Sequence, residues 1–78
     1  MDRIEVAIRY DEAMQPVPLQ FTWQKRVYRV EEIGRRWQEA GDLHILCMAP
    51  GSQVYELVYS PAQGEWTLGH RPPPVAAA

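Results

Sequence analysis

Cysteine, long apolar runs and an excess of one charge are all scarce in this sequence of 78 residues. The single cysteine, Cys47, excludes an internal disulfide and is typical of a reducing compartment. No apolar run approaches the length of a membrane span, and the first residues lack the pattern of a secretion signal. We therefore expect a cytoplasmic protein that makes no contact with membranes. The formal net charge of −2 is also a poor electrostatic match for nucleic acid.

Residues that could perform chemistry are sparse as well. The soft metal-ligand candidates are His44, Cys47 and His70, but a closed zinc site needs four ligands, and His44 and Cys47 would face opposite sides of a strand. The adjacent carboxylates at residues 11–12 and 31–32 are interpreted as solvated charges, and no glycine-rich phosphate loop is present. An enzyme would need His44, His70 and a carboxylate to converge in one pocket. We expect no enzymatic activity, no metal, no cofactor and no small-molecule substrate.

Apolar and aromatic residues are plentiful by comparison, with three Trp, four Tyr and one Phe. A chain of this length has room for one domain, whose small core supplies only about 3–5 kcal/mol of net stability. We predict a single β domain over residues 1–70. A Pro/Ala-rich tail over residues 71–78 is expected to be extended and loosely ordered.

The first half of the chain alternates apolar and polar residues, which is typical of half-buried strands. Residues 3–10 form one such strand, and the two prolines within residues 11–18 indicate a connection. Residues 19–30 predict a tight hairpin with a two-residue turn at Gln24 and Lys25. Lys25 would then need a positive φ angle, at a cost of about 1–2 kcal/mol. The facing pairs would be Trp23 with Arg26, Phe21 with Tyr28, and Leu19 with Val30.

Residues 31–41 have an ambiguous period. Val30, Ile33, Trp37 and Ala40 share one helical face, yet Gly34 lies in the middle and a good N-cap is absent. A bent or bulged strand is the rival interpretation, and the pattern does not separate the two.

Two further hairpins are predicted in the last third, with turns at residues 49–52 and 61–64. The strand over residues 54–59 is apolar at nearly every position, so we expect it to be central and covered on both faces. The predicted fold is therefore all-β and mainly antiparallel: a small curled sheet, roll or barrel of five to six strands. One short helix near residues 31–41 is an alternative that the sequence does not decide. In the last hairpin the facing pairs would be Tyr59 with Trp66, Leu57 with Leu68, and Tyr55 with His70.

Five of the eight basic residues gather in one stretch of the sequence, interleaved with aromatic residues that could stack on bases. They are the candidate surface for nucleic acid or for a protein partner. The five are Lys25, Arg26, Arg29, Arg35 and Arg36.

The motifs taken together resemble a family of small bacterial proteins of unknown function. Similar sequence recurs at the C-terminus of the catalytically inactive, Y-family-polymerase-like subunit of a bacterial mutagenic repair complex. The matching stretches include residues 4–6, 18–24, 26–33 and 36–37, followed by residues 54–57 and 64–68. The resemblance implies the fold more than a function, because the family has no established activity, and it associates the chain with DNA repair.

Our leading functional hypothesis is a non-catalytic interaction module that forms a homodimer or belongs to a larger assembly. The reason is that a one-faced, aromatic-rich sheet in so short a chain needs a second layer. The alternative is a module that binds single-stranded nucleic acid through the basic residues between Lys25 and Arg36.

Overall fold

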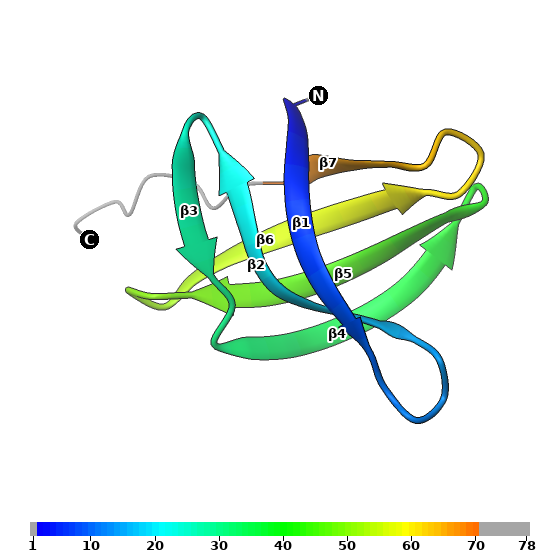
Figure 1. Cartoon of the computed structure of the whole chain (residues 1–78), viewed down its shortest axis with the longest axis horizontal. Helices are drawn as coiled ribbons and strands as arrows, with labels where there is room; N and C mark the ends of the chain where they lie inside the picture. Colours follow the sequence, from blue (N-terminus) through cyan, green and yellow to red (C-terminus); the bar gives the residue numbers. More distant parts are fainter. Residues whose placement is uncertain (1, 71–78) are drawn as a thin grey trace.

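The computed structural model describes residues 2–70, which form seven antiparallel strands and no helix (Figure 1). The all-β, curled-sheet prediction is confirmed, with seven strands in place of five to six. Residues 2–70 accordingly contain no helix long and apolar enough to cross a membrane. The predicted tail at residues 71–78 lies outside the described residues. The strands are β1 (Asp2–Tyr10), β2 (Pro16–Trp23), β3 (Arg26–Arg29), β4 (Glu32–Glu39), β5 (Asp42–Ala49), β6 (Gln53–Ser60) and β7 (Glu65–His70).

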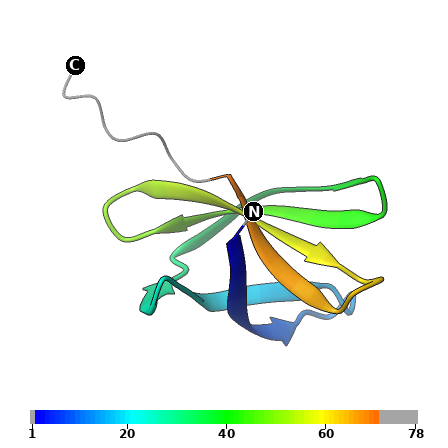
Figure 2. The same cartoon turned by 90° about the horizontal axis from the view of Figure 1, so that it is seen from above.

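The strands follow the order β3-β2-β1-β7-β6-β5-β4, and the sheet folds over on itself at β1. Residues 2–4 of β1 pair with β7, whereas residues 5–10 pair with β2. Because β1 belongs to both halves, β1–β3 form one layer and β4–β6 the other (Figure 2). The inner faces of the two layers enclose the core, so one long sheet supplies the second layer that a one-faced sheet needs.

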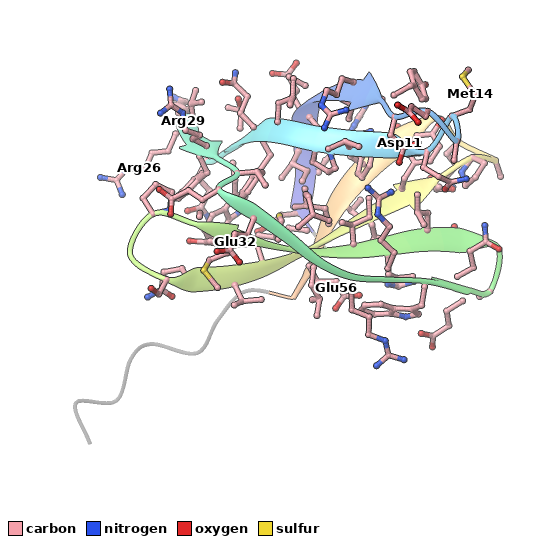
Figure 3. All side chains as sticks on the ribbon, turned by 90° about the horizontal axis from the view of Figure 1, so that it is seen from below. Asp11, Met14, Arg26, Arg29, Glu32 and Glu56 are labelled. Carbon is pink, nitrogen blue, oxygen red and sulfur yellow. The ribbon has the colours of Figure 1, made fainter. Side chains whose placement is uncertain are left out.

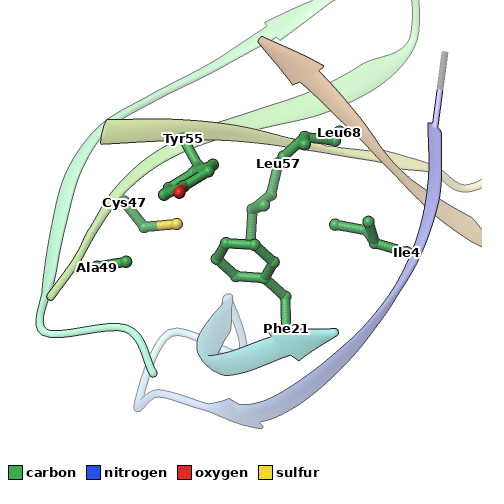
Figure 4. Close-up of a cluster of buried hydrophobic side chains, with 7 residues drawn as sticks. All are labelled: Ile4, Phe21, Cys47, Ala49, Tyr55, Leu57 and Leu68. Carbon is green, nitrogen blue, oxygen red and sulfur yellow. The ribbon is translucent and has the colours of Figure 1, made fainter. Parts of the chain in front are cut away.

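Phe21 lies at the centre of this core and is completely buried (Figure 4). Its ring stacks on Tyr28, with 5.1 Å between the ring centroids, and meets the edge of Tyr55 at 5.2 Å. Trp23 packs beside Tyr28 and donates a hydrogen bond from Nε1 to the Asp2 carboxylate at 2.9 Å. These four aromatic residues therefore serve the core. The buried cluster consists of Ile4, Phe21, Cys47, Ala49, Tyr55, Leu57 and Leu68.

The β2–β3 hairpin has the predicted register, with Phe21 opposite Tyr28 and Trp23 opposite Arg26. Both turn residues adopt positive φ angles, 52° at Gln24 and 66° at Lys25, which match the twist of the flanking strands. Leu19 was expected on the core face, but its residue is 45% exposed. The pairing with β1 skips this residue, so a β-bulge at Leu19 reverses the alternation.

The prediction that residues 11–18 are a connection is wrong for its last part. Strand β2 begins at Pro16, and Pro16 and Pro18 pair with Tyr10 and Ile8. Prolines are tolerated there because β3 pairs only with residues 20–23 of β2. No strand among residues 2–70 therefore lies beside Pro16 and Pro18 on the side away from β1, where it would accept a hydrogen bond from a backbone N–H group. The turn itself is closed by Asp11, whose Oδ1 accepts hydrogen bonds from two backbone N–H groups.

Most of residues 31–41 forms the bulged strand β4, and the helical alternative is wrong. The register of β4 against β5 shifts between Ile33 and Arg36. This bulge places Ile33 on the inner face and Trp37 on the outer face, so these two residues of the apparent helical face lie on opposite sides of the strand. The strand ends in a two-residue turn at Ala40 and Gly41, with φ angles of 54° and 86°.

Strand β6 is central, as predicted, and Tyr59 faces Trp66 while Leu57 faces Leu68. The third predicted pair is wrong, because His70 lies opposite Glu56 and not Tyr55. Gly69 is an extra residue in β7 at this point, and it moves His70 by one position. The prediction that β6 is covered on both faces fails at Val54, which is 38% exposed.

Candidate interaction surface

The second layer has two apolar faces. Along β5, Ile45, Cys47 and Ala49 point inward and are buried, as expected for alternating residues. The intervening residues Leu46 and Met48 lie on the opposite face and are only half-buried. Among residues 2–70, no strand forms a further layer over this outer face. The outer face of β4, β5 and β6 therefore carries half-buried apolar side chains over which residues 2–70 place no further layer.

Gly34 opens a shallow hollow of about 220 Å³ in this outer face. A Cβ atom at position 34 would stand 3.6 Å from Cβ of Leu46, so the missing side chain leaves the flank of Leu46 accessible. The bulge in β4 places the glycine here. The hollow is lined by Glu32, Ile33, Gly34, Leu46, Cys47, Met48 and Val54.

Next to the hollow, the outer face carries a stacked group of aromatic and charged side chains. Trp37 of β4 lies flat on His44 of β5, with 5.1 Å between centroids and 15° between planes. The guanidinium of Arg35 lies over Trp37, 5.2 Å from the ring centroid. On its other side, Nδ1 of His44 forms a short hydrogen bond with the carboxylate of Glu56. Arg35 on one side and Glu56 on the other therefore hold the stacked rings of Trp37 and His44 in place beside the apolar hollow.

The structure divides the five predicted basic residues between two elements. Lys25, Arg26 and Arg29 are exposed on the β2–β3 hairpin, which belongs to the first layer. Arg35 and Arg36 lie on β4, in the second layer. Nη1 of Arg36 donates a hydrogen bond to the Pro16 carbonyl at 2.7 Å and so bridges the two layers. Figure 3 shows Arg26 and Arg29 at the upper layer and Glu56 on the opposite side of the molecule.

The remaining chemical candidates are dispersed. Cys47 is a buried core residue, and burial raises the pKa of its thiol to about 11, which disfavours the reactive thiolate. Residues 2–70 contain no group of three His, Cys, Asp or Glu side chains placed to hold a metal ion. The side chain of His70 lies outside the described part. A cavity of about 360 Å³ between the layers has no acidic, basic or thiol side chain in its lining, which is Ile8, Tyr10, Pro16, Gln38, Leu43, Tyr59, Pro61 and Trp66.

No protein-family model, curated protein or solved structure matches this chain. Functional inference therefore depends on the geometry of the surface. Sequence reasoning singled out the basic residues and missed the hollow at Gly34. The available signal was the apolar character of both sets of alternating positions in β5 and β6. Such strands need cover on both faces, and the described chain covers only one of them completely.

Proposed function

We propose that this domain is a non-catalytic interaction module that binds a protein partner through the outer face of β4, β5 and β6. The observation that carries the proposal is an apolar sheet face, with a hollow at Gly34, over which the described chain places no further layer. A sheet whose inner face already builds the core has no folding requirement for apolar residues on its outer face. Apolar side chains that line an open hollow of this kind are typical of binding sites.

The shape of the hollow indicates the chemistry of the partner. Leu46, Met48 and Val54 supply apolar walls, and methionine adapts its shape to the group that it contacts. Glu32 supplies a carboxylate at the rim. An apolar anchor side chain next to a lysine or arginine would fill the hollow and meet this charge, an arrangement that is common at interface hot spots.

The test is affinity capture of the partner from the native host with four forms of the domain. Gly34→Leu places a side chain in the hollow, where its Cβ atom meets only ordinary contacts with Leu46. Val54→Asp places a charge on the outer face, and Val27→Asp is its matched control on the first layer, where Val27 is 62% exposed. The wild type and Val27→Asp should retain the same partner, and the other two variants should lose it. A partner retained equally by all four forms would contradict the proposal.

Association with a bacterial DNA-repair assembly extends this proposal, and its support is the motif resemblance alone. Binding of single-stranded nucleic acid is the weaker candidate. Its basic residues are divided between two layers, and Arg36 is already engaged with Pro16. It predicts an affinity that falls steeply with salt and with the double change Arg26→Ala and Arg29→Ala. Salt-independent failure to bind single-stranded oligonucleotides would exclude it.

A further inference from the structure

Strand β4 is one end of the sheet. It pairs with β5 on one side, and no strand within residues 2–70 pairs with it on the other (Figure 1). Its exposed residues include Arg35, Gln38 and Glu39. An edge of this length with unpaired backbone groups is a template for another strand, and monomeric proteins usually protect such edges.

The outer side of this edge carries a cation, an aromatic ring and a carboxylate in sequence. Arg35, Trp37 and Glu39 are two residues apart, so they share one face of the strand. Arg35 lies 5.2 Å over the Trp37 ring, and Nε1 of Trp37 donates a hydrogen bond to Oε1 of Glu39 at 3.2 Å. The positive end of this stripe thus lies two residues before Trp37, and the negative end lies two residues after it.

The hairpin turn determines which backbone groups point to the free edge. Glu39 and Asp42 flank the two-residue turn, and its closing hydrogen bond joins them. Hydrogen-bonded and non-hydrogen-bonded pairs alternate along an antiparallel ladder. The N–H and C=O groups of Trp37 therefore point toward β5, and those of Arg36 and Gln38 point outward.

We infer that two copies of this chain pair antiparallel along β4, with Trp37 of one copy opposite Trp37 of the other. In this register Arg36 of each copy exchanges backbone hydrogen bonds with Gln38 of the other, which uses the outward-pointing groups. Arg35 of each copy then lies opposite Glu39 of the other, so two ion pairs flank the symmetry axis. The stripe is complementary to a rotated copy of itself.

Neighbouring registers lack this complementarity. Centring the paired strands on Arg36 places Arg36 of one copy opposite Arg36 of the other. Centring them on Gln38 places Glu39 opposite Trp37 and separates both ion pairs. Since like charges opposite each other are destabilising, charge selects the register centred on Trp37.

This self-pairing goes beyond the proposed function because it uses the backbone edge of β4 and not the hollow in the outer face. The partner-binding hollow is built around Gly34, Leu46 and Val54, and the self-pairing edge consists of residues 35–39. A failed dimerisation test leaves the capture experiment unaffected, and a failed capture experiment leaves the dimer unaffected.

The experiment measures the mass of the full chain by size exclusion with light scattering, from micromolar to millimolar concentration. The interface is short, so we expect a reversible dimer that accumulates with concentration. Arg35→Glu places two glutamates opposite each other, and Glu39→Arg does the same with two arginines, so each variant alone should stay monomeric. An equimolar mixture of the two variants restores both ion pairs and should recover the dimer mass. Arg29→Glu, on the edge strand β3, is the matched control and should behave as the wild type.

Three results would overturn the inference. They are a wild type that stays monomeric at millimolar concentration, a single variant that dimerises as the wild type does, and a mixture that fails to recover the dimer.

Discussion

Gly69 lies so close to Val58 that a Cβ atom at position 69 would stand 2.7 Å from Cγ2 of Val58. This contact arises where the bulge in β7 brings its backbone against the outer side of β6. The exposure of the outer face changes along β6, since Val58 is 6% exposed and Val54 is 38% exposed on the same face. The outer face is thus buried at Val58, beside Gly69 of β7, and accessible at Val54, which lines the hollow.

The close approach predicts that Gly69→Ala destabilises the domain. The added methyl group must displace Val58 or the carboxylate of Glu56, and overpacking of this kind costs about 1–3 kcal/mol. The measurement is the free energy of unfolding in urea. Gly34→Ala is the matched control, because its Cβ would make only ordinary contacts, and it should change stability by less than about 0.5 kcal/mol. Equal unfolding midpoints for the two variants would contradict the contact.

The hairpin registers could be predicted from the sequence, because apolar alternation and turn length together leave few arrangements. Three of the departures from the predicted alternation occur at bulges. Leu19, residues 33–36 of β4 and Gly69 each interrupt the alternation by an inserted residue. A period of two cannot locate such an insertion, since the bulge is selected by packing between the layers and by close approaches such as that of Gly69.

The candidate site was harder to predict than the fold. Nearness in sequence suggested one basic surface, although strand alternation already implies that Arg35 and Arg36 point to opposite faces. The structure shows their separate engagements, with Trp37 for Arg35 and with Pro16 for Arg36. The hollow depends on an absent side chain at Gly34 beside a bulge, and such a feature becomes visible only when the neighbouring strand is in place.

The β2–β3 turn predicts that Lys25→Gly stabilises the domain. Lys25 has a φ angle of 66°, where side chains other than glycine are strained by about 1–2 kcal/mol. Glycine relieves this strain but loses more entropy on folding, so the net gain should be about 0.5–1 kcal/mol. A higher urea midpoint would show it.

The reciprocal variant Gly41→Lys provides the control for the turn. Gly41 occupies the second position of the β4–β5 turn with a φ angle of 86°, and it has open space around it. Lysine there should lower the free energy of unfolding by about 1 kcal/mol through backbone strain alone. If both substitutions moved stability in the same direction, the left-handed geometry would not be the cause.

Buried Cys47 predicts a loss of stability at alkaline pH. Burial raises the pKa of its thiol from the ordinary value of 9.0 to about 11 in the folded domain. Between these values the unfolded chain releases a proton that the folded chain retains, so the free energy of unfolding falls as pH rises through this window. Below about pH 8 both states keep the proton, and the contribution is constant.

Cys47→Ala isolates this effect from the other groups that titrate at alkaline pH. Burial first, and then the charges of Tyr28 and Cys47, raise the pKa of Tyr55. That tyrosine is present in both proteins, so the difference between them retains only the part of its titration that depends on Cys47. The variant should be less stable than the wild type by about 1 kcal/mol near pH 7, because it leaves a small cavity. This gap should narrow as pH rises from about 9 to about 11, as measured by urea unfolding at each pH. A gap that stays constant across the range would mean that the Cys47 thiol is not held protonated by the fold.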